Sequence, residues 1–570
     1  MSTSDKLKKY AKNLHLTGNA TEQTKKQRKS DIREYLLLSS LAMVVGIIVG
    51  LASIAFRSLI SFTHNFFFLG EASFRYDEYQ HMFFNYGWLV FIVPAIGGLL
   101  VGLLIKYGKA QEAKGHGVPE VMYAVIKNKG RIKPRIGIVK ALASAITIGS
   151  GGSAGREGPA IQIGAAGGSS IGQFLGLSDE KVRILVGCGT AAGIAATFNA
   201  PIAGVVFALE LILLEFKTKS FVPLVVSSVV ATIIAHLFLG EAVAYPIRGI
   251  AEIYILRSPY ELLLYLLLGV IAGLAALFFI KFFYKIEDFF DALKIRDYTK
   301  PMLGGLLLGI VGLLTFQIFG GYFIFGTGYG TVMPALLSEN FSPDMMYTGM
   351  QLALFILLLM FLKMLATALT LGSGGSGGVF APSLWIGAML GAAFGVMANL
   401  VFPGIAAPFG AYALVGMAAF FAGASRATLT AIIILFEMTS TYEIILPLMF
   451  ACVVADAVSR ILSKDTIYTF KMRKKGVRYS YDREINVLET CEVGEVMVKD
   501  VECITGDMTL GQISEKILLT GYQGFPYLDG EGKLCGIITH SDVKEALKKG
   551  TPSDTPFCKI KSECKPEIAY

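Results

Sequence analysis

The chain has 570 residues, of which 54% are hydrophobic and only 16% are charged, and its mean hydropathy is +0.59. This composition excludes a soluble protein of this size, so most of the chain must lie in lipid. The formal net charge of +8 gathers before the first apolar run and after the last one, which predicts cytoplasmic termini and argues against a nucleic-acid partner.

The first 33 residues form a polar, lysine-rich segment, which we interpret as a cytoplasmic tail. It lacks an apolar core with a small-residue cleavage site, so no signal peptide is predicted. A multi-pass domain of the cell (inner) membrane is predicted at 34–475, as two repeats at about 34–240 and 260–475. Apolar runs near the ~20 residues that cross a bilayer are Tyr35–Phe56, Trp88–Ile105, Phe221–Leu239, Leu262–Phe279, Met302–Phe319 and Leu352–Leu371.

Three apolar runs are shorter and are interrupted by glycine or proline, namely Ile136–Ile148, Ile184–Ala196 and Ile202–Leu214. Such segments are typical of broken or re-entrant helices that line a site. Two glutamates, Glu210 and Glu437, end corresponding apolar helices of the two halves. Each is predicted either to mark the membrane interface or to face a water-filled vestibule.

A glycine-rich stretch, Gly149–Gly168, returns almost unchanged at Gly372–Gly391. The offset is constant, since 372 − 149 = 223 and 387 − 164 = 223, and it also carries Lys140 onto Lys363. This match indicates an internal duplication. Each copy is a Gly/Ser turn followed by proline and an apolar run, which predicts a helix start inside the membrane. Two such starts meeting at the midplane would hold an anion with backbone N–H groups and helix dipoles.

A second turn, Lys114–Glu120, reads KGHGVPE and also predicts a helix start. His116 at its centre has two interpretations, a solvated loop histidine or an imidazole at an ion path, and the local sequence favours the first. Tyr468 follows the last membrane helix, as an interfacial aromatic or as an ion-facing group.

Residues 485–570 are polar, and Phe525–Asp542 predicts a strand, an Asp-Gly turn, a second strand and a helix from Ser541. Five of the seven cysteines lie in this part, none in a CxxC pair. We therefore expect neither a metal site nor disulfides.

Three stretches together resemble the CLC family of chloride channels and proton-coupled chloride antiporters. The family's Gly-Ser-Gly-Ile-Pro-Glu motif is matched by Gly115–Glu120, its Gly-Arg-Glu-Gly-Pro motif by Gly155–Pro159, and its Gly-Ile-Phe-Ala-Pro motif by Gly378–Pro382. The resemblance implies an all-α polytopic membrane fold of two inverted repeats with broken and re-entrant helices. It also implies a homodimer with one path per subunit for chloride and other small anions.

The resemblance assigns roles to particular residues. Glu157 matches the glutamate that occupies the outer anion position when deprotonated and leaves it when protonated, and Lys140 matches a buried lysine that favours anions nearby. The groups it implies at the anion are His116, Gly117, Arg156, Gly158, Val379, Phe380 and Tyr468.

Two positions depart from the family pattern. His116 replaces the serine whose hydroxyl touches the ion, which leaves open the preference for Cl⁻ over nitrate and makes the ion-facing interpretation the favoured one. Leu211 stands where many antiporters carry an internal proton-transfer glutamate, so protons would reach Glu157 through water or through another acid such as Glu210, or transport is not proton-coupled.

The tail resembles one CBS domain, an α/β cytoplasmic module, and Thr555–Tyr570 could begin a truncated second unit. Thr539 and Asp542 fit its adenine-nucleotide signature, although a helix-capping role for this segment is an equally good interpretation. No other cofactor is expected.

Exchange of Cl⁻ for H⁺ with Glu157 as gate is the first functional hypothesis, and a passive gated anion channel, favoured by Leu211, is the alternative. An enzyme with a phosphate cradle is disfavoured because no GK[ST] follows the glycines. A fluoride-specific exporter is disfavoured because Gly155–Pro159 and the spacing of the first motif fit the chloride branch better.

Overall fold

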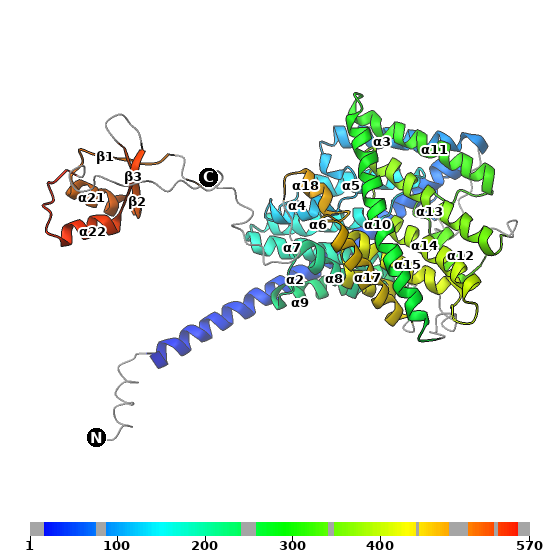
Figure 1. The fold of residues 1–570 in the computed structure, drawn as a ribbon, viewed down its shortest axis with the longest axis horizontal. Coiled ribbons are helices and arrows are strands. Elements are labelled where there is room, and N and C mark those ends of the chain that lie inside the picture. Colours follow the sequence, from blue (N-terminus) through cyan, green and yellow to red (C-terminus); the bar gives the residue numbers. More distant parts are fainter. Residues whose placement is uncertain are drawn as a thin grey trace, which may run out of the picture. The chain divides into compact units, whose positions relative to one another are not determined.

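The computed structural model describes residues 16–75, 87–240, 258–339, 347–439, 444–477, 497, 500–528 and 534–556, with the backbone alone for 16–32. The chain divides into two compact units, Met1–Tyr481 and Asp482–Tyr570 (Figure 1). The first residues of the basic tail, the predicted boundary at 485, three cysteines and most of Thr555–Tyr570 lie outside the described residues.

The first unit is helical, and its two halves present their elements in the same order. The first half contains α2 (Leu16–His64), α3 (Val93–Tyr107), α4 (Val118–Ile126), α5 (Pro134–Gly149), α6 (Glu157–Phe174), α7 (Asp179–Phe198), α8 (Pro201–Phe207) and α9 (Thr218–Leu239). The second half contains α10 (Glu261–Ala292), α11 (Lys300–Phe319), α12 (Tyr329–Leu337), α13 (Gly349–Gly372), α14 (Phe380–Val401), α15 (Phe409–Ser425), α16 (Thr428–Thr439), α17 (Ile445–Leu462) and α18 (Thr469–Lys474). Short π and 3₁₀ turns complete it at Asn65–Leu69, Gly87–Phe91, Gln111–Ala113, Ala208–Leu213 and Asp297–Thr299.

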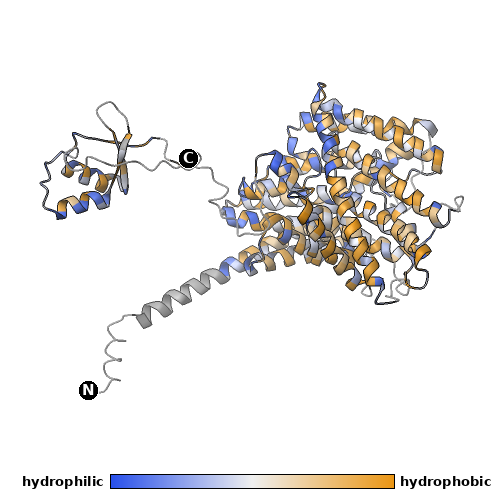
Figure 2. Cartoon of the chain, viewed as in Figure 1, coloured by the Kyte–Doolittle hydropathy of each residue, from blue (hydrophilic) through white to orange (hydrophobic). Residues whose placement is uncertain are grey.

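Within the described part of the chain, nine helices are long and apolar enough to cross a membrane. The outward faces of these helices carry large apolar side chains, such as Ile47, Ile233 and Leu314, that only lipid or another apolar surface would cover. In Figure 2 the helices of this unit are mostly coloured hydrophobic. The predicted interruption of Ile184–Ala196 is wrong, because this segment lies inside the continuous helix α7.

The glycines of α7 serve helix packing. A methyl group added to Gly164 of α6 would lie 2.0 Å from the carbonyl oxygen of Gly189, and one added to Gly189 would lie 1.9 Å from that of Gly164. The second repeat has the same crossing, where Gly387 of α14 and Gly416 of α15 each leave only 2.4 Å to the other's carbonyl oxygen. Small residues thus let two pairs of membrane helices approach backbone to backbone.

Glu210 and Glu437 connect the two repeats through helix caps. The Glu210 carboxylate accepts hydrogen bonds from the backbone N–H of Leu429 (3.3 Å) and of Thr430 (2.9 Å), at the start of α16. Glu437, at the end of α16, accepts from the N–H of Ile202 (3.0 Å) and of Ala203 (2.7 Å), at the start of α8. Each glutamate therefore accepts hydrogen bonds from first-turn backbone N–H groups of the corresponding helix in the other repeat, which have no partner within that helix.

The second unit is a small α/β fold with the sheet order β1-β2-β3. Its elements are β1 (Ile504–Thr505), α21 (Leu510–Thr520), β2 (Gly524–Leu528), β3 (Leu534–Thr539) and α22 (His540–Lys548). β1 pairs parallel with β2, and β2 pairs antiparallel with β3. The predicted strands and helix are present, with the helix starting one residue earlier than expected, whereas the Asp529–Gly530 turn lies outside the described residues.

Candidate functional site

The two duplicated Gly/Ser turns meet inside the first unit. The N–H of Gly155 donates to the carbonyl oxygen of Gly378 at 2.8 Å, and the N–H of Gly378 donates to that of Gly155 at 2.7 Å. Directly after these glycines, α6 begins at Glu157 and α14 begins at Phe380, positions that are related by the same offset of 223 (380 − 157). Two helix starts, whose first N–H groups have no acceptor within their own helix, therefore converge on one buried point.

The hydroxyls behind this junction follow the same symmetry. Ser153 of the first copy shares a hydrogen bond with Thr367 (3.0 Å), and Ser376 of the second copy shares one with Ser144 (2.9 Å). The two turn serines are related by the offset of 223 (376 − 153), and so are their two partners (367 − 144). Each turn is thus anchored to the helix that precedes the other turn, which fixes the two helix starts relative to each other.

The side chain of Glu157 lies at this junction and is 1% exposed. One carboxylate oxygen lies 3.3 Å from the N–H of Ala381, in the first turn of α14, and the other accepts from the Tyr329 hydroxyl at 3.4 Å. A carboxylate of the first repeat therefore sits at the helix start of the second, where an anion is favoured. Tyr329 belongs to α12 and was not identified from the sequence.

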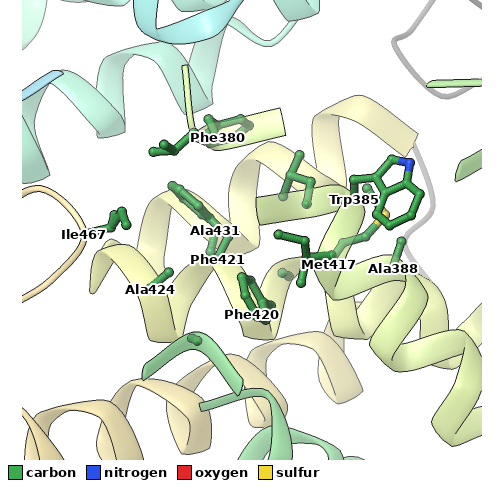
Figure 3. Packing of buried hydrophobic residues seen from close by; sticks show 14 of the residues in the cluster. Phe380, Trp385, Ala388, Met417, Phe420, Phe421, Ala424, Ala431 and Ile467 are labelled. Atoms are coloured by element: carbon green, nitrogen blue, oxygen red, sulfur yellow. The ribbon is translucent and has the colours of Figure 1, made fainter. Parts of the chain in front are cut away.

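Aromatic residues close the site on the side of Phe380. Its ring packs against Phe421 of α15, with centroids 4.4 Å apart, and against Phe198 of α7, at 5.4 Å. Figure 3 shows Phe380 beside Phe421 at the border of the large apolar cluster. The guanidinium of Arg156 lies 5.3 Å from the centre of the Tyr329 ring. The Glu157 side chain is therefore buried beside aromatic residues, with the backbone N–H of Ala381 on one side.

His116 and Tyr468 are brought together at the start of α4, although 352 positions (468 − 116) separate them in the sequence. Their ring centroids are 6.0 Å apart, and the Nε2 atom of His116 lies 3.4 Å from the Tyr284 hydroxyl. That hydroxyl donates to the carbonyl oxygen of Ile467 at 2.6 Å. The Nδ1 atom of His116 is buried and has no hydrogen-bond partner among the described residues.

Lys140 supports the turn that carries His116. Its buried ammonium donates to the carbonyl oxygens of Ala113 (3.1 Å) and Gly115 (2.6 Å). Gly117, the last residue of the turn, has φ +79° and leaves room for the Lys140 stem. Only glycine adopts this backbone conformation readily, so the lysine and the glycine together shape the start of α4.

An ion-pair cluster fastens α18 to α4. The Lys475 ammonium contacts both oxygens of Glu120 at 2.7 and 2.6 Å, and Lys471 lies 3.4 Å from the same carboxylate. The Glu120 side chain is 7% exposed, whereas that of Lys475 is 38% exposed. Because Tyr468 directly precedes α18, this cluster positions the tyrosine relative to His116. The sequence indicated the two lysines only as part of the basic segment after the last membrane helix, and it did not pair them with Glu120.

Replacing Glu120 by glutamine is expected to lower thermal stability in detergent, because two ammonium groups lose their buried counter-charge. About 1–3 kcal/mol is expected, reduced from the value for a fully buried pair since Lys475 reaches solvent. Thermal unfolding of Glu120→Gln and wild type measures the change. Glu180→Gln, which removes the exposed contact with Lys219, is the control and should leave the midpoint unchanged. Equal unfolding midpoints for all three proteins would contradict a stabilising role of the ion-pair cluster.

The remaining predicted site residues have structural contacts. Leu211 is fully buried in the apolar core, and the adjacent Glu210 caps α16. In the second unit, Thr539 and Asp542 form a capping box at the start of α22, in which the Asp542 carboxylate accepts from the Thr539 N–H at 2.9 Å. Among the described residues, no group of three His, Cys, Asp or Glu side chains has the geometry of a metal site.

Comparison with known proteins shows that this chain is similar to chloride channels and chloride transporters. Residues 97–460 match the family model described as voltage gated chloride channel, and residues 493–549 match the CBS domain model. A putative chloride channel protein ClcB-like from Ralstonia nicotianae is 34% identical over 385 residues, covering 67% of this chain and 85% of the relative. The H(+)/Cl(-) exchange transporter ClcA of Yersinia pestis is 32% identical, covering 76% of this chain and 87% of the relative.

A solved structure shares the fold. The crystal structure of a slow cyanobacterial Cl⁻/H⁺ antiporter superposes with a TM-score of 0.65 at 26% identity, covering 77% of this chain and 97% of that one. The match extends over most of the membrane unit, so the expected arrangement of two inverted repeats with broken helices is confirmed.

Proposed function

This chain belongs to the voltage-gated chloride channel (CLC) family, and we propose that it exchanges chloride for protons, with Glu157 as the group that gates the anion path and carries the proton. The observation that carries the proposal is the buried Glu157 carboxylate at the start of α14, 3.3 Å from the N–H of Ala381. A relative named H(+)/Cl(-) exchange transporter, 32% identical, supports the choice of ions.

The mechanism follows from competition for the same donors. An ionised Glu157 occupies the N–H groups at the helix starts and excludes chloride from them. A proton taken up by its carboxylate removes the negative charge, so the side chain leaves and chloride replaces it. Release of the proton on the opposite side restores the carboxylate and expels the anion. Each ion therefore moves only when the other does.

Chloride uptake driven by a pH gradient tests this proposal. Proteoliposomes with equal chloride on both sides and a pH difference across the membrane should accumulate labelled chloride against its gradient, at zero membrane potential. Chloride equilibration without accumulation would contradict exchange and would favour a channel.

The channel is the second candidate, and Leu211 is the observation that favours it. An aliphatic side chain carries no proton, and Leu211 is fully buried at the position where many antiporters of the family have a glutamate. If exchange operates, the inner part of the proton route must use another group. His116 lies just before α4 and is titratable, whereas Glu120, in the first turn of α4, is paired with Lys471 and Lys475.

The hydrogen bonds around His116 give it a specific role. Because the Tyr284 hydroxyl donates its proton to Ile467, it accepts from His116, which places the proton of a neutral imidazole on Nε2. The Nδ1 atom then offers a lone pair, which repels an anion. We propose that an anion at the start of α4 is bound together with a proton on Nδ1, so that His116 replaces the missing glutamate as the inner proton carrier.

Proton uptake on chloride binding checks this role. In a Glu157→Gln background, calorimetry in two buffers with different ionisation enthalpies should show about one proton bound with chloride. With His116→Ser added, the uptake should vanish, and the relative affinity for chloride over nitrate should change, since a hydroxyl replaces a larger cationic donor. Equal proton uptake and equal anion preference in both proteins would remove His116 from the mechanism.

Further expectations accompany this function. We propose that the protein is a homodimer in the cell membrane with both termini in the cytoplasm, and that the second unit binds an adenine nucleotide. Because the capping box already uses Thr539 and Asp542, nucleotide binding requires their remaining hydrogen-bonding capacity. Calorimetry with ATP on the full chain, wild type against Asp542→Ala, tests the last point.

A further inference from the structure

The turn that carries His116 has a counterpart in the second repeat. Gly326–Thr327–Gly328 precedes α12 as Gly115–His116–Gly117 precedes α4, with an offset of 211 (326 − 115 = 211). Lys363 donates to the carbonyl oxygens of Ile324 (2.9 Å) and Gly326 (3.0 Å), as Lys140 does to Ala113 and Gly115. The duplication therefore builds the same lysine-supported turn twice.

The second turn is connected to the site of Glu157 through the residue that follows it. It leads directly into Tyr329, whose hydroxyl donates to Glu157 at 3.4 Å. Thr327 and Gly328 are partly exposed, whereas Tyr329 is buried. The turn is thus partly exposed, and it directly precedes the tyrosine whose hydroxyl contacts Glu157.

The two turns differ in the side chain that packs against their last glycine. At Gly117 this is the Oε1 atom of Gln162, a hydrogen-bond acceptor, 3.0 Å from where a Cβ would lie. At Gly328 it is the indole of Trp385, with Nε1 2.7 Å from the corresponding point. Trp385 is the equivalent of Gln162, because 385 − 162 = 223. An acceptor in the first repeat is therefore replaced by a donor in the second.

The donor of Trp385 lacks a partner among the described residues, although the side chain is only 1% exposed. Figure 3 shows the indole at the border of the apolar cluster, with its nitrogen turned away from Phe380, Phe420 and Phe421. The Lys363 ammonium lies 5.5 Å from the centre of the ring. A buried N–H donor without an acceptor is costly, and an anion next to a lysine satisfies it.

We propose that this turn is an anion-binding position that recruits a small halide-like anion before it reaches Glu157. The anion is held by the Trp385 N–H and the Thr327 hydroxyl, with the Lys363 ammonium behind them. The inference deepens the proposed function and rests on it for the direction of transport. The binding itself requires only the described contacts of the second repeat.

Tryptophan fluorescence tests the position directly, since Trp88 and Trp385 are the two tryptophans of the chain. In a Trp88→Phe background Trp385 is the sole indole, and bromide bound beside it should quench its emission with a saturable dependence on concentration. Thr327→Val should raise the half-saturating bromide concentration about 3- to 10-fold, the effect of one lost hydrogen bond. Thr331→Val, on the helix that follows the turn, is the matched control, because its hydroxyl contacts the Phe323 carbonyl oxygen, and it should leave that concentration unchanged.

A crystallographic measurement on the wild type tests the same anion position without any substitution. Bromide-soaked crystals of the wild type should show anomalous density within hydrogen-bonding reach of Trp385 Nε1. Linear quenching, equal behaviour of both threonine variants, or no density there would overturn the position even if chloride transport is intact. Saturable quenching without proton-coupled transport would support the position and contradict the proposed exchange.

Discussion

Replacing Glu157 by glutamine is expected to abolish proton coupling while chloride flux continues. Glutamine has nearly the same shape as the protonated glutamate but cannot release a proton, so the side chain no longer alternates between excluding and admitting the anion. Simultaneous recording of chloride efflux and pH in proteoliposomes should give a proton flux indistinguishable from protein-free vesicles, against a wild-type signal in fixed proportion to chloride.

Two other glutamates of the same unit provide matched controls. Glu437 caps α8 and Glu210 caps α16, and both carboxylates are held by backbone N–H groups instead of facing the anion junction. Glu437→Gln and Glu210→Gln should therefore keep the wild-type ratio of protons to chloride. Persistent coupling in Glu157→Gln would exclude Glu157 as the carrier, and loss of coupling in Glu210→Gln would place the proton route through that cap.

Replacing Gly189 by leucine is expected to prevent the first repeat from folding. The carbonyl oxygen of Gly164 lies 1.9 Å from the position of the first added carbon, and it is backbone, so no side-chain rotation relieves the clash. Overpacking at such a crossing costs more than about 3 kcal/mol, and α6 would separate from α7. Because α6 begins at Glu157, loss of the α6–α7 contact also displaces Glu157 from the start of α14.

Size-exclusion chromatography in detergent and thermal unfolding measure this effect. We expect aggregated or undetectable Gly189→Leu protein and a similar loss for Gly416→Leu, since the second repeat has the equivalent contact with Gly387. Gly404→Ala is the control, because nothing lies within 4 Å of an added carbon there. A monodisperse Gly189→Leu protein with the wild-type unfolding midpoint would contradict the role of the crossing.

Much of the membrane unit could be predicted because the duplication is visible in the sequence. The offset of 223 relates Glu157 to Phe380 and Lys140 to Lys363, and it is enough to expect two converging helix starts. The sequence also shows how the halves differ, since one carries a carboxylate and the other an aromatic wall.

The partners of these residues could not be predicted in the same way. Tyr284 and Tyr329 lie outside the three motifs, and their hydroxyls reach His116 and Glu157 only after α10 and α12 have packed. Trp385 follows the third motif, but its unsatisfied N–H depends on the neighbouring Gly328 turn. Such contacts join distant elements, and local patterns carry no signal for them.

The glycines of α7 carry two signals in the sequence. The short run Ile184–Ala196 suggests a broken helix, which is wrong because α7 is continuous, whereas helix packing is the favoured role of Gly187, Gly189 and Gly193. Inside a membrane the cost of glycine in a helix is offset by the close packing that it permits, here against Gly164 and Ala160. Glycine follows the end of a helix at Gly151 and Gly374, where the backbone adopts positive φ angles.

Proton movement driven by a chloride gradient is the most direct measurement of the central claim. Wild-type protein in vesicles with equal pH on both sides and high internal chloride should pump protons inward, against the gradient that develops, as chloride leaves. Vesicles that start with equal chloride and equal pH on both sides should give no proton signal. Rapid chloride efflux with no proton movement would contradict exchange and identify the chain as a passive anion channel.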